Sequence, residues 1–303
     1  MKLLLIDGHY YVYRSFHAIQ NLTNSKGEPA NAVYGFVKTV RKMIKDVRPD
    51  LAAVFWDAGM PQKRVALQPA YKQQREAMPD KMIPQLVFIQ SFCAAMGLVS
   101  ISKPDTEADD LMGCYVMAAR REGVEVVLAT NDKDLFQLVD RQVTVYSTNK
   151  GDLKHPKDSH ALLGEIEVTQ KWEVPPAQIA EVLALTGDSV DNIPGIEGVG
   201  PKTAVNLIRE FGTVDNLLLR LAEVKNEKLR LRLQESEQQI RDNRQMVQLE
   251  LDHPLPVEIP NLHIKPNYPE YIRGLEKYEF KTLLPEVQRE AANIFVGQGE
   301  LPL

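Results

Sequence analysis

The sequence predicts an α/β fold built on a parallel β-sheet, followed by a mostly helical region. In the first half, short apolar runs alternate with longer stretches whose apolar residues recur at helical spacing. Such alternation is typical of strands joined by crossover helices, which pair in parallel. From about Gln170 onward the apolar spacing is mostly helical. The length of 303 residues is sufficient for one large domain or two.

The elements of the first half are predicted as follows. Four apolar runs are expected to be strands: Lys2–Ile6, Leu51–Trp56, Val124–Ala129 and Val143–Tyr146. Three stretches are expected to be helices: Val33–Val47, Ile83–Met96 and Glu107–Glu122. We expect Asp105 and Thr106 to cap the third helix and Gly123 to end it.

The second half contains two long amphipathic stretches, Thr203–Phe211 and Leu217–Met246. The proline-rich stretch from Pro254 to Pro269 predicts an irregular segment. Residues 271–284 are expected to form a last short helix. Residues 286–303 are expected to form a loosely ordered tail.

The composition, 44% hydrophobic and 25% charged, is that of an ordinary globular protein. The longest apolar run is far short of the ~20 residues of a membrane span. Cys93 and Cys114 imply neither a disulfide framework nor a zinc site, so we expect a cytoplasmic protein. The net charge of −5 argues weakly against a nucleic-acid partner. Local patches of charge carry more weight than this sum.

Acidic residues recur just past the predicted strands and in two other places. Because ligands bind at the carboxyl ends of parallel strands, we expect the side chains after the strands to converge. An aspartate after a strand often only caps the next helix, and acidic residues favour a helix's first turn. Crowded together, however, they would repel one another unless a cation lay among them. The nine candidates are Asp7, Asp57, Glu107, Asp109, Asp110, Asp132, Asp134, Asp188 and Asp191.

The chemistry of these side chains predicts the metal. All-oxygen ligands without clustered His or Cys favour Mg²⁺ or Mn²⁺. Two such ions about 4 Å apart are a common arrangement for phosphodiester hydrolysis. The sequence therefore predicts a two-metal site for phosphate chemistry.

The stretch LTGDSVDNIPGIEGVGPKTA places two of these carboxylates directly before a glycine-rich turn. Glycines at this spacing allow the bare backbone to approach a ligand closely. The amides at the start of the following helix suit an anion such as phosphate. The turn is predicted to hold a phosphate backbone through Gly195, Gly198, Gly200, Lys202 and Thr203.

A polar stretch between Asp57 and Ile83 carries several cations and one tyrosine. It could be a solvated loop, but long loops in compact domains usually have a function or are disordered. Lys and Arg neutralise phosphates, and Tyr stacks on unpaired bases. The candidates for contact with nucleic acid are Lys63, Arg64, Tyr71, Lys72 and Arg75.

Seven motifs in family order resemble the 5′ nuclease (flap endonuclease) family, most closely the 5′–3′ exonuclease domain of bacterial DNA polymerase I. They span about residues 1–285: IDGHYYVYR, VYGF, FWDA, YKQQR, TEADD, TNDKDLFQL and the glycine-rich stretch above. One departure is that Val65 and Ala66 follow Arg64 where the family often has Arg-His-Glu. Trp56 also replaces the usual Phe.

The resemblance implies a PIN-like nuclease domain over residues 1–168 with a helical arch at about 58–85. It also implies a helix–hairpin–helix DNA-binding domain over residues 169–285 and a tail over 286–303. Asp134, Asp188 and Asp191 would surround the second metal ion and the other six carboxylates the first. Arg14, Lys72 and Arg75 would act on the scissile phosphate, and Tyr71 would stack in the arch.

The implied activity is structure-specific 5′–3′ exonuclease and flap endonuclease action in DNA replication and repair. The implied substrate is DNA with a free 5′ end, a 5′ flap or a nick, or an RNA primer on DNA. A DNA polymerase is the implied protein partner, the nucleoid the location, and K⁺ an additional ion at the hairpin.

Three alternatives are weighed against this interpretation. A PIN-like ribonuclease would share the acidic cluster, but typically in a shorter chain that lacks the hairpin. A non-catalytic DNA-binding module would be expected to lack some of the nine carboxylates, and all nine are present. A Mg²⁺-dependent phosphotransferase would be expected to carry a GxxxxGK[ST] loop, which the sequence lacks.

Overall fold

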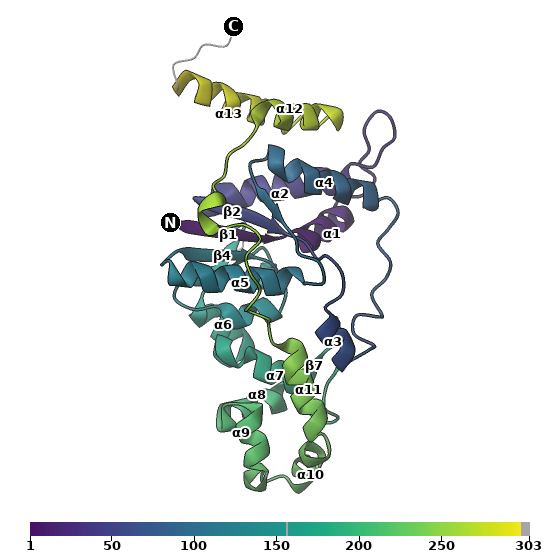
Figure 1. Cartoon of the computed structure of the whole chain (residues 1–303), viewed down its shortest axis with the longest axis vertical. Helices are drawn as coiled ribbons and strands as arrows, with labels where there is room; N and C mark the ends of the chain where they lie inside the picture. The colour runs from purple at the N-terminus through teal and green to yellow at the C-terminus, as the bar shows by residue number, and fades with distance from the viewer. Residues whose placement is uncertain (156, 298–303) are drawn as a thin grey trace. The chain divides into compact units, whose positions relative to one another are not determined.

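The computed structural model describes residues 1–155 and 157–297 (Figure 1). The chain forms two compact units. Unit 1 comprises Met1–Trp56, Ala77–Ser102 and Pro256–Leu303, and unit 2 comprises Asp57–Glu76 and Lys103–Leu255.

Unit 1 contains a parallel sheet in the order β3-β2-β1. The central run Leu3–Ile6 of β1 is completely buried, as is all of β2. Burial on both faces explains why these strands are continuously apolar rather than alternating. The strands are β1 (Lys2–Asp7), β2 (Leu51–Phe55) and β3 (Val99–Ile101). The two predicted strands are confirmed, and β3 was not predicted.

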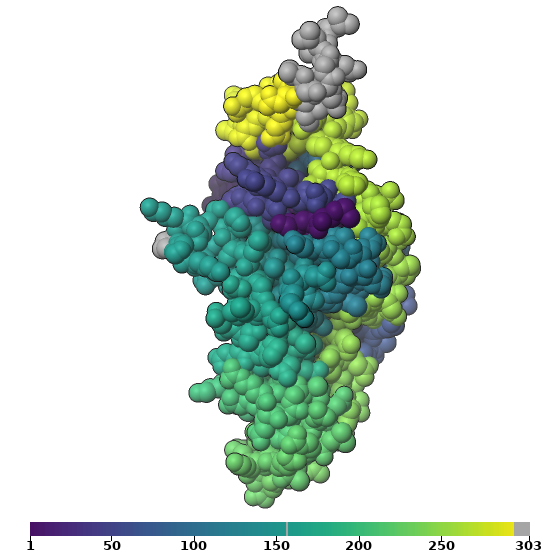
Figure 2. Space-filling view, turned by 90° about the vertical axis from the view of Figure 1, so that its left-hand side faces the viewer, coloured from purple at the N-terminus to yellow at the C-terminus, as the bar shows by residue number. Residues whose placement is uncertain are grey.

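The predicted helices Val33–Val47 and Ile83–Met96 are present as α2 and α4. In α2, the buried residues include Val33, Phe36, Val40, Met43 and Val47 at helical spacing, and Arg48 in a left-handed conformation ends the helix. Figure 2 shows the first residues of the chain at the surface, where Met1 is exposed. The helices are α1 (Gly8–Ala18), α2 (Asn31–Val47), α4 (Ile83–Ala95), α12 (Tyr268–Lys277), α13 (Leu284–Gly297) and the 3₁₀ turn η5 (Ile259–Asn261).

The C-terminal part of the sequence is more helical than predicted. Helix α12 starts at Tyr268 and ends at Lys277, so the helix expected over residues 271–284 is misplaced. Helix α13 then occupies most of the segment expected to be a loosely ordered tail. Its buried residues Val287 and Ala291 are spaced by four, which gives the helix an apolar face to pack. Residues 298–303 of the expected tail lie outside the described part of the chain.

Unit 2 contains a mixed sheet, because β4 and β5 are parallel whereas β5 and β6 are antiparallel. The predicted parallel sheet therefore has one antiparallel edge, which β6 forms. The three-residue strand β6 was too short to give an apolar signal. The strands are β4 (Glu125–Ala129), β5 (Val143–Ser147), β6 (Ala161–Leu163) and the short pair β7 (Gly187–Asp188) and β8 (Ile193–Pro194).

Helices dominate the rest of unit 2, as predicted. The amphipathic stretch Leu217–Met246 forms more than one helix, and a new helix begins where Asn226 accepts from the Leu229 N–H. The helices are α3 (Gln62–Leu67), α5 (Ala108–Arg121), α6 (Glu165–Trp172), α7 (Ile179–Thr186), α8 (Pro201–Phe211), α9 (Val214–Leu219), α10 (Glu227–Glu235) and α11 (Glu237–Val247). The 3₁₀ turns are η1 (Asp134–Leu138), η2 (Lys150–Asp152), η3 (Pro176–Gln178) and η4 (Leu221–Glu223).

The start of α5 differs from the prediction. Asp105 has a left-handed backbone (φ 56°), and the N-cap residue Glu107 makes no capping hydrogen bond with its side chain. Instead, the Ala108 N–H donates to Asp57 Oδ1 at 2.8 Å. A carboxylate from a distant part of the chain thus satisfies one of the free N–H groups at the helix start. Gly123 follows the helix with φ 66°, as expected for a helix stop.

Candidate active site

Five of the nine predicted carboxylates gather at one place in unit 2. Glu107, Asp109 and Asp110 form one group and Asp109, Asp132 and Asp134 another, so Asp109 is shared. Within each group the ligand oxygens lie within 4.8 Å of one another. The cluster therefore combines the first turn of α5 with the loop after β4.

Local hydrogen bonds set the shape of the loop after β4. The Asp132 N–H donates to Thr130 Oγ1 at 3.0 Å, and the Asp134 N–H donates to Asp132 Oδ1 at 2.9 Å. Asp134 then opens the 3₁₀ turn η1. These bonds turn the chain sharply, so that carboxylates two positions apart reach the same point.

Asp188 and Asp191 come from the connection between α7 and α8. Both are buried, and their charges help to raise the pKa of Asp132 and of Asp134. The Lys133 ammonium pairs with Asp188 at 2.7 Å. The two carboxylates are thus close enough to the cluster to act on it electrostatically.

The electrostatics of the cluster are unfavourable for its charged form. Burial raises the pKa of Asp109 well above its usual range, and the neighbouring Asp110 and Glu107 raise it further. Burial also raises the pKa of Asp134 well above its usual range, followed by the charge of Asp132. Compensating positive charge beside these groups would favour their ionised forms.

The side chains present fit divalent cations. Among the residues that the structure describes, Asp134 Oδ1 is buried and has no hydrogen-bond partner. A buried carboxylate oxygen without a partner is costly, and an ion would satisfy it. The donors of both groups are all carboxylate oxygens, the set that hard divalent cations prefer.

Arg64 lies inside this cluster rather than on a DNA-facing surface. It pairs with Glu107, and its guanidinium donates to Asp110 at 2.8 and 2.9 Å. Its side chain is only 4% exposed. The prediction that Arg64 contacts DNA does not agree with this geometry, because its donors are used in a buried ion-pair network. Asp110, predicted as a metal ligand, uses both oxygens for Arg64.

Tyr71 is also buried, so its ring is not offered to a base as the predicted stacking role requires. Its hydroxyl lies 3.1 Å from Glu107 Oε2 and 3.1 Å from Asp191 Oδ2. Burial followed by these two negative charges raises its pKa, so the hydroxyl stays protonated and can donate. Tyr71 thereby links the two acidic parts of the site.

Lys72 and Arg75 bring positive charge to the same carboxylates. The Lys72 ammonium pairs with Glu107 and lies 3.5 Å from Asp191 Oδ2, with 8% of the side chain exposed. Arg75 pairs with Asp191 at 2.9 Å and is 45% exposed. Lys63 is 74% exposed and pairs with Glu250. Their predicted roles toward phosphate stay predictions.

The segment that carries these cations is docked on the connection between α7 and α8. Gln68 Nε2 donates to the Asn192 carbonyl, and Asn192 Nδ2 donates to the Ala70 carbonyl at 2.6 Å. The Lys72 N–H donates to the Asp191 carbonyl at 3.2 Å. Asn192 adopts a left-handed conformation (φ 60°) that directs its side chain toward this segment.

The predicted phosphate-binding turn is an exposed loop that leads into α8. Gly198 has φ 79°, which favours glycine, and Gly200 is the N-cap residue of α8. A Cβ at Gly195 would collide with the Thr186 carbonyl oxygen. The three glycines and Lys202 are exposed, whereas Thr203 is half-buried. Their role in binding DNA stays a prediction.

Two predicted site residues belong to unit 1. Asp7 accepts from the Tyr10 N–H at 3.0 Å and so caps α1. Arg14 is exposed and donates to the Tyr10 hydroxyl at 2.8 Å. Their roles in metal binding and catalysis also stay predictions.

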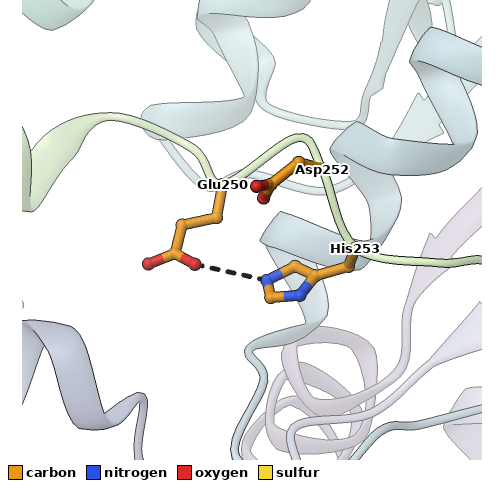
Figure 3. A group of neighbouring side chains, drawn as sticks. All are labelled: Glu250, Asp252 and His253. Atoms are coloured by element: carbon orange, nitrogen blue, oxygen red, sulfur yellow. Dashed lines mark ion pairs between the residues drawn. The ribbon is translucent and has the colours of Figure 1, made fainter.

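A third group of possible metal ligands, Glu250, Asp252 and His253, lies outside the cluster (Figure 3). Lys63 pairs with Glu250 at 2.9 Å, and the Lys103 ammonium lies 3.1 Å from His253 Nδ1. The two ammonium groups balance the charges of the two carboxylates. This surface group therefore lacks the excess of negative charge found around Asp109.

Sequence reasoning missed several residues that position the site. Asn243 is buried and donates to the Ala184 and Pro194 carbonyls, at 3.0 and 2.8 Å. It therefore fastens both sides of the α7–α8 connection. Lys133 and Asn192 are each next to a predicted carboxylate in the sequence, and this position could have indicated that they belong to the site. No local pattern distinguishes Asn243 in its polar helix.

Comparison with known protein families decides the relationship. Residues 2–173 match the family model of the 5′–3′ exonuclease N-terminal resolvase-like domain. Residues 174–270 match that of the 5′–3′ exonuclease C-terminal SAM fold. The chain belongs to the 5′–3′ exonuclease family. This confirms the predicted resemblance, the α/β fold followed by a helical domain, and the class of hydrolase.

The chain is similar to two kinds of relative. It is 38% identical over 286 residues to the thermostable DNA polymerase I of Thermus filiformis, covering 94% of this chain and 33% of the relative. It is 35% identical over 288 residues to a 5′–3′ exonuclease of Aquifex aeolicus, covering 95% of each. The chain thus spans about a third of its polymerase relatives.

Solved structures show the same fold. The chain resembles the T5 D15 protein co-crystallised with metal ions, with a TM-score of 0.68 and 24% identity, over 82% of this chain and 90% of the other. It resembles flap endonuclease-1 from Methanococcus jannaschii with a TM-score of 0.57 and 17% identity, over 95% and 90%. In the described residues, no helix is both long and apolar enough to span a membrane.

Proposed function

We propose that this protein is a structure-specific 5′–3′ exonuclease and flap endonuclease that hydrolyses phosphodiester bonds of DNA. The observation that carries the proposal is the partly buried carboxylate cluster around Asp109, which adjoins cations that can meet a phosphate. Its substrate would be DNA with a free 5′ end, a 5′ flap or a nick, including RNA primers on DNA. Its roles would be primer or flap removal in replication, and repair.

The cluster would hold two Mg²⁺ or Mn²⁺ ions. Glu107, Asp109, Asp132 and Asp134 are the carboxylates best placed to bind them, with Asp7 and Asp57 added by the family resemblance. The ions would supply an activated water and charge stabilisation for the leaving oxygen. Asp188 and Asp191 would serve the second ion. Lys133, paired with Asp188, holds that carboxylate in place.

The chain's own cations would orient the scissile phosphate. Lys72 and Arg75 pair with Glu107 and Asp191, so an approaching phosphate can exchange with these carboxylates as their partner. Arg14 would add a further donor. Positive charge aimed at the phosphate stabilises the transition state more than the ground state.

DNA binding would be divided between two regions. The exposed turn from Gly195 to Gly200, with Lys202 and Thr203, would hold duplex phosphates through backbone amides and charge, and would bind K⁺ through its carbonyls. The arch at about residues 58–85, with Lys63, would guide the 5′ strand. The proposed domains are 1–168, 169–285 and the tail 286–303, the proposed partner is a DNA polymerase, and the proposed location is the cytoplasm.

The test compares 5′-flap DNA with the equivalent RNA, with and without Mg²⁺. We expect Mg²⁺-dependent cleavage of the DNA from its 5′ side, leaving a 5′-phosphate and a 3′-hydroxyl. A strand blocked at the 3′ end should be cut equally well. Full activity in excess EDTA, or a preference for a free 3′ end, would contradict the proposal, and a preference for RNA would favour a PIN-like ribonuclease.

A further inference from the structure

A cavity in unit 1 takes no part in the proposed hydrolysis. Its volume is about 840 Å³, within the range of sites for small ligands. Helix α2 forms one wall with Tyr34, Lys38 and Lys45, and α12 contributes Tyr271. In Figure 1, α12 and α13 lie above α2 and α4 within this unit.

The wall formed by α2 carries more basic side chains than the neighbouring carboxylates pair with. Arg41 pairs with Glu286 at 3.2 Å and Glu290 at 2.7 Å, and Lys42 pairs with Asp46 at 2.5 Å. Neither of the remaining two lysines forms an ion pair with a described residue. These lysines, at positions 38 and 45, are seven residues apart and therefore share one face of the helix.

The cavity also contains a polar group that the protein leaves unsatisfied. Tyr271 is 3% exposed, and its hydroxyl lies beside the Arg41 guanidinium but donates to no acceptor among the described residues. Arg41 donates to Glu286 and Glu290, and because a guanidinium carries only donors it cannot accept the proton of the Tyr271 hydroxyl. Burial raises the pKa of Tyr271 to about 12, so the hydroxyl is protonated at neutral pH and can donate. A buried donor without an acceptor is rare in folded proteins.

The lining indicates the chemistry of a ligand. Rings such as Tyr34, together with aliphatic residues such as Leu283 and Ile44, offer apolar surface for a flat ring system. Lys38 and Lys45 offer charge for an anionic group, and the Tyr271 hydroxyl offers a donor. A ligand with an aromatic ring, a phosphate and hydrogen-bond acceptors satisfies all three.

We propose that this cavity is a binding site for a free nucleotide, with Tyr271 and Lys45 as its specific contacts. The proposal does not depend on the proposed hydrolysis, since the acidic cluster lies in unit 2. A site of this kind would let nucleotide concentration act on the enzyme.

Titration calorimetry of the full chain with deoxyadenosine monophosphate in EDTA tests the proposal. The chelator removes divalent ions through which a nucleotide could bind the acidic cluster. We expect saturable binding below about 1 mM, and binding at least about tenfold weaker for deoxyadenosine, which lacks the phosphate. Absence of saturable binding, or equal affinity for the nucleoside, would overturn the proposal.

Matched variants locate the site. Tyr271→Phe and Lys45→Gln should each weaken binding about tenfold. Tyr34→Phe is the control, because the Tyr34 hydroxyl already lies 3.2 Å from Thr282 Oγ1 and should be dispensable. Lys26→Gln, an exposed lysine in a loop, controls for general charge. The proposal is wrong if both site variants bind like the controls.

Two further measurements complete the test. Tyr271→Phe keeps the ring contact with Phe92, so its melting temperature should not fall, and a folded variant with weaker binding supports the proposal. Binding of a single-stranded oligonucleotide should be unchanged by Tyr271→Phe. If the oligonucleotide loses as much affinity as the nucleotide, the cavity serves DNA strands and the assignment to a free nucleotide is overturned.

Discussion

Lys63 and Arg64 are adjacent cations in opposite environments, which gives a sharp test of the ion-pair network in the site. The Lys63 side chain is 74% exposed and the Arg64 side chain 4% exposed. Arg64 donates to Glu107, to both oxygens of Asp110, and to two carbonyls at the C-terminal end of α11. We therefore predict that replacing Arg64 destabilises the protein far more than replacing Lys63.

The magnitude follows from what Arg64→Met leaves behind. Methionine fills much of the volume but leaves Glu107 and Asp110 buried without their cation. Breaking a buried ion pair from one side costs about 3–5 kcal/mol, because the remaining charge is uncompensated. At about 2–4 °C per kcal/mol, the melting temperature should fall by about 10 °C.

The assay is thermal unfolding followed by circular dichroism, in EDTA so that no divalent ion replaces the lost charge. Lys63→Met is the matched control and should melt close to the wild type. In a double-mutant cycle, adding Asp110→Asn to Arg64→Met should recover part of the loss, since one uncompensated charge is removed. A melting temperature for Arg64→Met within about 2 °C of the wild type would refute the reasoning.

Four further predictions concern the same site. Asp134→Asn should raise the melting temperature in EDTA at pH 8 and abolish its increase by Ca²⁺. Because burial raises the pKa of Asp134 in the fold, the gain should shrink as the pH is lowered and the wild-type carboxyl takes up a proton. Lys72→Ala should lower the single-turnover cleavage rate by about 100-fold with little change in duplex affinity by anisotropy. Asn192→Gly, which keeps the left-handed backbone, should slow the same step about tenfold without loss of stability, whereas a normal rate would show that the docking is not needed. Gly198→Val should weaken binding of every duplex alike, because φ 79° strains a branched residue and phosphate contacts carry no base information; normal duplex binding would contradict this role.

The elements that could be predicted are those set by local patterns. The central run of β1 and all of β2 are buried, so their apolar runs predicted both their positions and their parallel pairing. The carboxylates after β4 and at the start of α5 could be grouped because their positions follow from where a strand ends and a helix begins. Three-residue β6 and the antiparallel edge that it forms left no comparable signal.

The direction of a long side chain could not be predicted, because its partners are distant in the sequence. Arg64 reaches Glu107, 43 positions away, and the Met246 carbonyl, 182 positions away. The sequence shows a cation in a polar stretch, which suits contact with DNA as well as a buried ion pair. The same limit applies to Tyr71, whose hydroxyl reaches Asp191, 120 positions away.

The cations of this segment differ in exposure, and the difference indicates two tasks: balancing buried carboxylates and attracting the DNA strand. Arg64 and Lys72 are 4% and 8% exposed and balance the charge of Glu107 from within. Arg75, at 45%, and Lys63, at 74%, keep solvent-facing charge that a phosphate can reach without disturbing the core of the site. A cluster rich in carboxylates repels a polyanion, so the inner cations lower that repulsion and the outer ones attract the strand. Lys72 pairs with Glu107, as Arg64 does, and lies near Asp191, which also pairs with Arg75. This position suits a cation that exchanges a carboxylate partner for a phosphate.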